Sequence, residues 1–535
     1  MLGKQVSGFD FRKLIRYFGV GVFMLTLAGI MVDVGWAANE SDDSYYKEHP
    51  LFHPFPREDK KIQSIDRFGP VGIGIELRQP AFRMRIKNVE KGSPAAATGK
   101  LKKGQWIESV NGRVLKDIDP RRILGQIITE AEATDGRVVF RLKDKDSEDA
   151  PVQEVTVQIP ALGAYSDTWP LECEKSDKIV RDFADYLARN GGNFAGPSIR
   201  GMGLLFMLST GEEKDLKIAR KWVKKLVAKY ERTENISSYP WYAGYGGPGL
   251  CEYYLRTGDK SILPVIAKIA DNMKRNMYNS AWGGRGGCPF SYMGGGHMNA
   301  AGVHVVTFLL LAKECGVEVD EYTLQESLKH FYRFAGRGNT PYGDGLPEGG
   351  FVDNGKVGGL AFAMAAATSL NPEGENSVYA KARDISAVKG FYSTSWMLHG
   401  HTGGGIGEIW RSASMGLMYD KKPTKYREFM DNRMWFYELS RRYNGSFGII
   451  GGGRYDKPSS WGIGLALTYT MPRKTLQLTG APDTQYSHEY KLSDRPWGTA
   501  ADDVFYSLEA GEYKPGKRQE VDAEKLETDA SWPIL

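Results

Sequence analysis

Residues able to act as acids, bases or charge stabilisers gather in a few short segments. Four of the eight histidines lie in two such segments: His297, His304, His399 and His401. His297 and His304 are seven residues apart, a spacing that would put them on one face of a helix. Glu408 and Arg411 follow closely enough to share a helix face with His401. Burying such groups on an inner helix is costly, so they form either a catalytic set or a satisfied core network.

A second group of candidates is acidic. Glu348 and Asp353 flank a pair of glycines, and Asp344 precedes them. A glycosidase needs two carboxylates, one kept protonated and the other ionised. A polysaccharide lyase instead removes a proton next to a uronic carboxylate, with a tyrosine or histidine base and a group that steadies the enolate. The chain could supply either set, whereas loop acids also serve as caps or are simply solvated.

Aromatic residues, histidines and acids recur on glycine-rich segments that precede apolar helices, as expected of a sugar-binding cleft. Glu408 and Asp353 are the expected acid and base. His297, His401 and Arg411 would position the substrate or stabilise charge. The expected substrate-binding residues are Trp241, Tyr245, Tyr292, Tyr342, Glu348, His399 and Tyr455.

These segments connect helices that recur in pairs from about Ile179 onward. Apolar helices rich in glycine and alanine are expected at 202–209, 249–255, 300–315, 358–370, 405–418 and 461–469. Amphipathic helices follow at 219–230, 262–277, 324–335, 379–388 and 426–442. The apolar helices must be covered and the amphipathic ones must lie outside, so two concentric rings of about six hairpins are predicted. An open solenoid is the alternative.

The stretch from Phe68 to residue 160 has a different pattern. Apolar and polar residues alternate, which predicts strands at 72–77, 82–86, 106–110, 138–142 and 152–159. Pro94 suits the first turn of a short helix. Asp119 is expected to cap a second helix, with Pro120 in its first position. The apolar stripe of that helix is Leu124, Ile127, Ile128 and Ala131.

Four motifs in this stretch resemble a bacterial PDZ domain between Phe68 and Lys143: Gly72-Ile73-Gly74-Ile75, Gly92-Ser93-Pro94-Ala95, Leu101 to Gly104, and Val110-Asn111-Gly112. Gln105 departs from the aspartate that the family usually has. The resemblance implies that a protein carboxyl terminus or extended peptide adds as a strand at Ile75 to Leu77. The implied peptide-binding residues are Gly72, Ile73, Gly74, Ile75, Leu77, Leu124, Ile127 and Ile128.

The ligand of this groove could be another protein or the chain's own apolar end at Leu535. The alternative is an empty groove in a module that only docks onto its neighbour.

The helical part resembles the α/α toroids of six-hairpin glycosidases, toroidal polysaccharide lyases and terpene cyclases. The architecture from about 179 to 471 carries this resemblance. It implies a central cavity whose mouth is surrounded by the segments before the apolar helices. An aspartate-rich motif of the terpene cyclase kind is missing from the apolar helices, which favours a polysaccharide. A non-catalytic scaffold that presents binding surfaces is the alternative.

The first forty residues predict export to the periplasm or the cell exterior. Basic residues precede an uncharged run of fourteen residues at 19–32, and small residues follow at Ala37-Ala38. This is the order of a secretory signal peptide, and the run is shorter than the ~20 residues of a membrane span. We expect cleavage near Ala37 or Ala38 and no stable membrane span in the mature chain. An uncleaved anchor is the alternative.

Composition and missing motifs exclude several classes of function. The 70 basic residues are interspersed with 65 acidic ones, for a net charge of +5, so nucleic acid is not an expected partner. The four cysteines lack the spacing of thiolate metal sites and are expected to be packed thiols. A metal site at His297, His399 and His401 has no standard spacing either, so neither a metal nor a cofactor is predicted. Serine-protease nucleophile motifs, phosphate loops and dinucleotide fingerprints are missing too.

The predicted protein is therefore multidomain. A signal peptide spans 1–38 and a linker 39–67. A small α+β PDZ domain at 68–160 is followed by an all-α domain, an α/α toroid, at 179–475. A C-terminal extension occupies 476–535.

Overall fold

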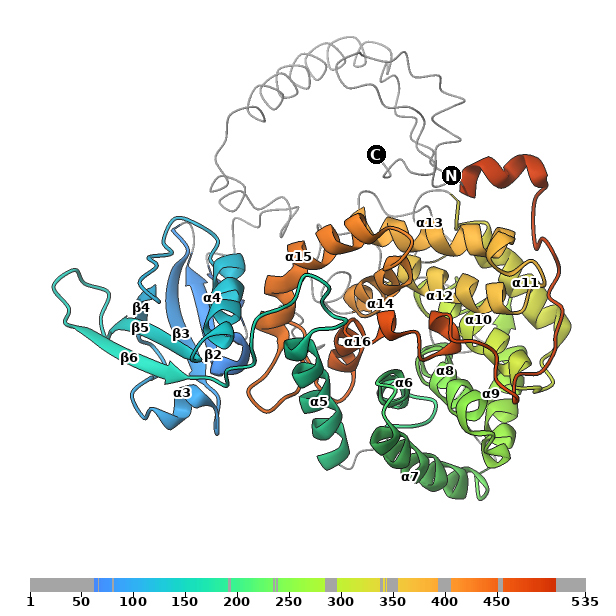
Figure 1. The fold of residues 1–535 in the computed structure, drawn as a ribbon, viewed down its shortest axis with the longest axis horizontal. Coiled ribbons are helices and arrows are strands. Elements are labelled where there is room, and N and C mark those ends of the chain that lie inside the picture. Colours follow the sequence, from blue (N-terminus) through green and yellow to red (C-terminus); the bar gives the residue numbers. More distant parts are fainter. Residues whose placement is uncertain are drawn as a thin grey trace, which may run out of the picture. The chain divides into compact units, whose positions relative to one another are not determined.

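The computed structural model describes residues 62–65, 67–78, 81–190, 194–233, 236, 239–283, 296–336, 340–341, 343, 355–392, 406–450 and 456–506, without the side chains of 62–64, 391–392, 406 and 504–506. All of these lie in one unit of the chain, Pro50–Leu535. The predicted signal peptide and the chain end at Leu535 fall outside them. Figure 1 shows the elements in chain order.

An antiparallel sheet opens the described part of the chain. Its strands follow one another in space as in sequence: β1 (Ile62–Ile65), β2 (Ile73–Arg78), β3 (Arg83–Val89), β4 (Trp106–Val110), β5 (Arg137–Lys143) and β6 (Val152–Gln158). Alternation holds well in β5, where Val138, Phe140 and Leu142 are buried. The five predicted strands are confirmed. β1 falls in the predicted linker and was not predicted.

Two helices accompany this sheet. α3 (Pro94–Ala97) is capped by Ser93, whose Oγ accepts a hydrogen bond from the backbone N–H of Ala96 at 3.2 Å. α4 (Arg121–Ala133) buries the predicted apolar stripe. Its start differs slightly from the prediction, because Pro120 is the N-cap residue and Asp119 Oδ1 accepts the N–H of Arg121 at 3.1 Å.

The rest of the described chain is helical, so the predicted order of a strand domain followed by a helical domain is confirmed. The helices are α5 (Glu174–Arg189), α6 (Met202–Ser209), α7 (Glu213–Tyr230), α8 (Pro240–Thr257), α9 (Leu263–Asn276), α10 (Asn299–Glu314), α11 (Glu321–Tyr332), α12 (Lys356–Ser369), α13 (Val378–Tyr392), α14 (Ile406–Met415), α15 (Pro423–Ser440) and α16 (Trp461–Leu467). A short hairpin, β7 (Met277–Tyr278) and β8 (Ala281–Trp282), precedes α10. Among the described residues, no helix is both long and apolar enough to cross a membrane.

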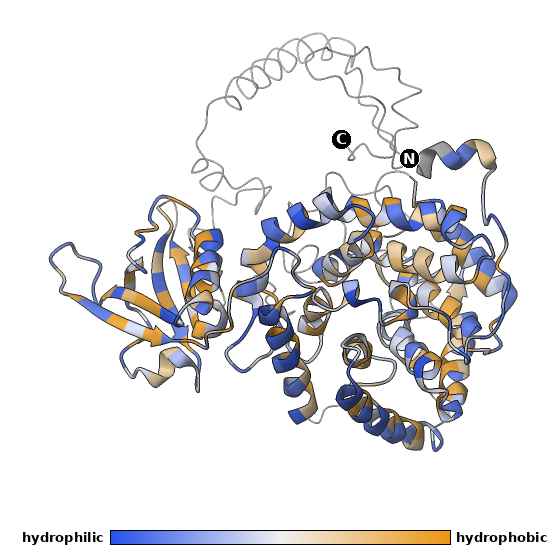
Figure 2. Ribbon diagram, viewed as in Figure 1, coloured by the Kyte–Doolittle hydropathy of each residue, from blue (hydrophilic) through white to orange (hydrophobic). Residues whose placement is uncertain are grey.

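The apolar helices pack on one another in a closed cycle. Within the described ranges, α6 packs on α8, α8 on α10, α10 on α12, α12 on α14, α14 on α16, and α16 on α6. Nearly every residue of α10 and α12 is buried, as expected of helices covered on all sides. Figure 2 shows these two helices as mainly hydrophobic and α7 as largely hydrophilic. α5 was not predicted, and it places an amphipathic helix before the first apolar one.

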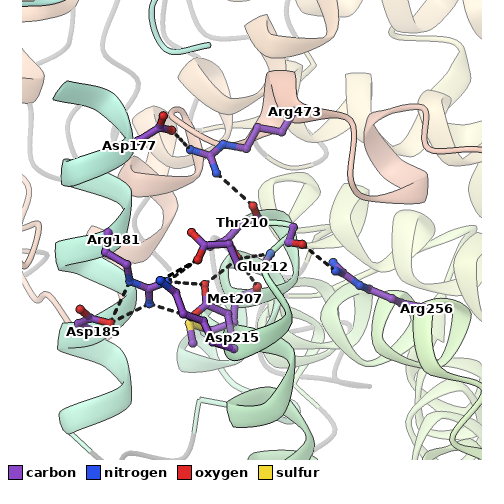
Figure 3. A network of polar contacts seen from close by, with 11 residues as sticks. Asp177, Arg181, Asp185, Met207, Thr210, Glu212, Asp215, Arg256 and Arg473 are labelled. Atoms are coloured by element: carbon purple, nitrogen blue, oxygen red, sulfur yellow. Dashed lines mark hydrogen bonds and ion pairs between the residues drawn. The ribbon is translucent and has the colours of Figure 1, made fainter. Parts of the chain in front are cut away.

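A polar network joins the beginning of this cycle to its end (Figure 3). Arg181 of α5 forms an ion pair of 2.8 Å with Asp215 of α7. Asp215 also accepts a hydrogen bond from Thr210, which follows α6. Arg473, which follows α16, donates to the carbonyl of Thr210 at 3.0 Å and pairs with Asp177 of α5 at 2.7 Å. The last helix of the cycle is thereby tied to the first hairpin.

Residues 475–492 run across the carboxyl ends of four cycle helices. Their hydrogen bonds reach these ends in turn: Thr475 to Ser209 of α6, Thr484 to Leu255 of α8, His488 to Glu314 of α10, and Leu492 to Leu370 after α12. Buried Glu252 of α8 also accepts the N–H groups of Gln477 and Leu478, at 2.9 Å each. Burial raises the pKa of Glu252 to about 7 against the opposing effect of these two donors. This segment covers one end of the cycle.

Four buried charges join the strand domain to the helices. Lys175 of α5 lies 3.0 Å from Glu132 of α4 and 2.7 Å from Glu438 of α15, and Arg441 pairs with both carboxylates. Burial would raise the pKa of Glu438, but Arg441 and Lys175 outweigh it and lower that pKa to about 2. Beside this cluster, α4 packs closely on α15, because a Cβ at Gly125 would lie 2.5 Å from the Cα of Trp435.

The three cysteines within the described ranges, Cys173, Cys251 and Cys315, are free and buried. The expectation of packed thiols is confirmed for them. Cys288 lies outside the described residues.

Replacing Lys175 by methionine should destabilise the protein by about 3–5 kcal/mol, because two buried carboxylates lose one of their two cations. The matched control is Lys214→Met, which removes a 2.8 Å pair with Glu212 at an exposed position, and it should cost about 1 kcal/mol or less. Urea denaturation followed by near-UV circular dichroism measures both. Equal midpoints for the two variants would contradict the role given to the cluster.

Candidate functional site

Aromatic rings from several helices meet at the end of the cycle opposite residues 475–492. The ring of Tyr245 stacks on Trp241 at 5.5 Å and on Trp410 at 5.4 Å between centroids, with interplanar angles of 18° and 7°. Trp461 meets Tyr245 edge-on at 6.0 Å. All four residues lie within the first two turns of α8, α14 or α16. We call Trp241, Tyr245, His304, Trp410 and Trp461 the aromatic cluster.

Trp241 and Tyr245 were predicted as substrate-binding residues on a segment before an apolar helix. That helix, α8, begins at Pro240 rather than at 249, so both residues lie inside it. Their spacing of four places them on one helix face, which explains the stacking. Tyr245 is buried, whereas Trp241 is half-buried and offers part of its ring to the surroundings.

His304 of α10 lies inside the aromatic cluster. Its ring centroid is 4.8 Å from that of Tyr245 and 4.6 Å from that of Trp410. Glycines on both neighbouring helices make room for it: a Cβ at Gly244 would lie 2.6 Å from His304 Cβ, and one at Gly359 would lie 2.4 Å from His304 Cε1. The glycines of α8 and α12 therefore allow these helix backbones to pack closely around the imidazole of His304.

Two polar atoms of the cluster are buried without a hydrogen-bond partner among the described residues: His304 Nε2 and Trp410 Nε1. Such atoms usually find a partner in a folded protein, so they mark a place where a polar ligand would be favoured. Burial lowers the pKa of His304 to about 3, which keeps its imidazole neutral at physiological pH. The cluster thus combines ring faces with two buried ring nitrogens.

Glu408 and Arg411, the predicted acid and charge stabiliser, lie elsewhere. Glu408 is fully buried and accepts hydrogen bonds from Arg411, at 3.2 Å, and from Ser412. Arg433 of α15 lies 3.6 Å from the same carboxylate. Helical periodicity puts Trp410 on nearly the opposite side of α14 from Glu408. Glu408 and Arg411 therefore belong to a buried ion network between α14 and α15, and they do not join the aromatic cluster.

His297 is also separate from His304. The shared helix face predicted for them does not exist, because α10 begins at Asn299 and His297 precedes it. His297 Nε2 lies 2.7 Å from the carbonyl oxygen of Tyr278, and its ring is 5.0 Å from that of His330. Burial, together with the charges of His297 and Arg333, lowers the pKa of His330 to about 3. This pair lies between the β7 strand and α11.

The remaining predicted site residues fall outside the described part of the chain. They are Tyr292, Tyr342, Glu348, Asp353, His399, His401 and Tyr455. The sequence puts Asp353 three residues before α12, and His401 five residues before α14.

Trp410 and Trp461 were not among the predicted site residues, and His304 was considered only as a member of a catalytic or core histidine set. One signal could have found them: aromatic or imidazole side chains recur near the amino ends of the apolar helices.

The predicted peptide groove of the strand domain is closed within the described residues. Its eight residues, Gly72, Ile73, Gly74, Ile75, Leu77, Leu124, Ile127 and Ile128, are all buried. The edge of β2 expected to take a ligand pairs with β1 instead. The backbone of Gly72 is left-handed (φ +82°), and a Cβ there would lie 2.1 Å from Ser93 Cβ.

Across the described ranges, no group of three or more His, Cys, Asp or Glu side chains is arranged to hold a metal ion.

The chain belongs to the family described as a domain of unknown function, DUF6288, which matches residues 176–480, more than half of the sequence. The match spans all twelve helices except the first two residues of α5, and it leaves out the strand domain. No curated protein and no solved structure matches the chain.

The neutral imidazole of His304 should make stability depend on pH. The unfolded chain protonates this residue near pH 6.5, and the folded protein does so only near pH 3, so stability is lost as the pH falls between these values. His304→Gln should reduce the loss measured between pH 6.5 and 4.5 by about 2 kcal/mol. Urea denaturation at the two pH values measures this loss. The exposed His488 supplies the control, His488→Gln, and an unchanged pH dependence in His304→Gln would contradict the assignment.

Proposed function

We propose that the protein is an exported, carbohydrate-active protein in which a PDZ-type module precedes an α/α toroid. The closed cycle α6, α8, α10, α12, α14 and α16, with amphipathic helices between its members, supports the toroid. The antiparallel sheet with α4 between β4 and β5, and the motif residues at the start of β2, support the PDZ-type module. The basic and apolar leader supports export to the periplasm or the cell exterior.

The aromatic cluster carries the proposal of a polysaccharide ligand. Flat rings that stack on sugar faces, with a few buried polar atoms to fix hydroxyl groups, are suited to a carbohydrate. The half-buried ring of Trp241 would be the first surface that the ligand meets, and His304 and Trp410 the polar groups beneath it. Residues 475–492 cover the opposite end of the cycle, so we assign the ligand to the end that carries the aromatic cluster.

The chemistry that we propose is hydrolysis or elimination, with Asp353 and His401 as the reacting acid and base. In the sequence, both precede a cycle helix by a few residues: Asp353 precedes α12 and His401 precedes α14. Glu408 and Arg411 receive a structural role instead, since their charges already neutralise each other in the core. Asp353→Asn should therefore abolish turnover and leave binding intact.

One observation favours a second function, that of a non-catalytic scaffold. His297, His304 and Glu408 lie in three separate environments, as they would in a protein whose polar side chains only stabilise its core.

The mature chain, residues 39–535, should bind at least one member of a panel of neutral and acidic polysaccharides. Release of reducing ends alone indicates hydrolysis, and added absorbance of an unsaturated product indicates elimination. Trp241→Ala should weaken binding about tenfold or more, because a stacking ring is lost. Trp497→Ala is the control, since Trp497 is an exposed tryptophan outside the cluster.

Binding without product would support the scaffold. Failure to bind any polysaccharide, or equal affinities for the two variants, would refute the carbohydrate site.

A further inference from the structure

The edge of β2 is already occupied by a segment of the same chain. β1 pairs antiparallel with β2 in the register Ile65 to Ile75, Ser64 to Glu76, Gln63 to Leu77 and Ile62 to Arg78. The opposite edge of β2 pairs with β3 over its whole length. A peptide that added to β2 as a strand would need the place that β1 holds.

β1 also has the direction that such a peptide would have. It runs toward the turn at the start of β2, where the N–H of Phe68 donates to the carbonyl of Ile73 at 2.6 Å. The side chain of Ile65 is fully buried, like Leu124 and Ile128 of α4. The intervening turn packs on α4, because a Cβ at Gly69 would lie 2.5 Å from Ile128 Cδ1. β1 therefore supplies both the backbone pairing with β2 and a buried apolar side chain, as a bound peptide would.

β1 is a short strand at the edge of the sheet. It is four residues long and is the first strand of the sheet order, so within the described residues its backbone pairs with β2 alone. Short terminal elements of this kind open at a lower free energy than the core of a domain. Two residues after the end of β1, Arg67 anchors the segment: it is buried, pairs with Asp456 and lies 3.9 Å from Glu90.

This anchor connects the strand edge to the helices. Asp456 also accepts the N–H of Ile449 at 2.9 Å and pairs with Arg442 at 3.1 Å. Asp456 is five residues before Trp461, the first residue of α16 and a member of the aromatic cluster. Arg67 therefore links the segment that follows β1 to the residues just before α16.

We propose that Ile62–Ile65 is a built-in ligand of the β2 edge, and that an extended peptide with an apolar carboxyl end binds there only by displacing it. The proposal rests on the PDZ-type assignment of the strand domain and is independent of the polysaccharide. Peptide affinity is then reduced by the fraction of molecules in which β1 is released.

Removing β1 should open the edge. The probe is a fluorescein-labelled peptide that ends in Ser-Trp-Pro-Ile-Leu, the last five residues of the chain. A variant beginning at residue 66 should bind it at least tenfold more tightly than the chain 39–535 in fluorescence anisotropy. Equal affinities, or no binding to the shortened variant, would overturn the proposal. Polysaccharide binding, measured in parallel, separates this failure from that of the carbohydrate site.

The anchor offers a test in the full-length mature chain. Arg67→Met should also tighten peptide binding, because it frees the end of β1. Arg442→Met removes another arginine from the same carboxylate but lies outside the strand domain, so the affinity should not change.

Hydrogen exchange gives a readout that needs no variant. Saturating peptide should increase amide exchange at Ile62–Ile65 while the β2 amides stay protected. Peptide binding without a change at Ile62–Ile65 would show that β1 is not displaced.

Discussion

Two carboxylates and two cations, buried together, determine how the strand domain meets the helices. Glu132 comes from α4, Lys175 from the first helix of the helical body, Glu438 from its last outer helix, and Arg441 directly follows that helix. Such charges are tolerated in a protein interior only when all of them are paired, so α4, α5 and α15 must be in place together. The cluster therefore links the beginning and the end of the helical body to the module that precedes it. Movement of one of these elements would leave a buried charge without its partner.

Close packing of apolar helices has a comparable effect at the aromatic end of the cycle. Glycines at 244 and 359 allow helix backbones to approach an imidazole that would otherwise not fit. This close helix packing excludes water from His304, and it brings ring faces from different helices into contact. The same geometry leaves His304 Nε2 and Trp410 Nε1 without a partner among the described residues, and the proposed ligand would supply one.

The strand domain adds a different kind of constraint. A sheet edge is a template for further strands, and proteins commonly cover it. Here the cover is β1, a segment of the same chain that runs in the direction of a bound peptide. Arg67 connects this cover to Asp456 and thereby to the start of α16.

Periodicity in the sequence was enough to determine the strands β2 to β6, most of the apolar and amphipathic helices, and their order, because these patterns depend on neighbouring residues. Trp241 and Tyr245 were chosen from their aromatic type on a glycine-rich segment, which is also a local property, although the sequence analysis placed that segment before the helix and not inside it. Only the tertiary structure decided that Glu408 faces α15 while Trp410 faces Tyr245, and that β1 occupies the β2 edge. These facts depend on pairings between distant segments, and such pairings leave no period in the sequence.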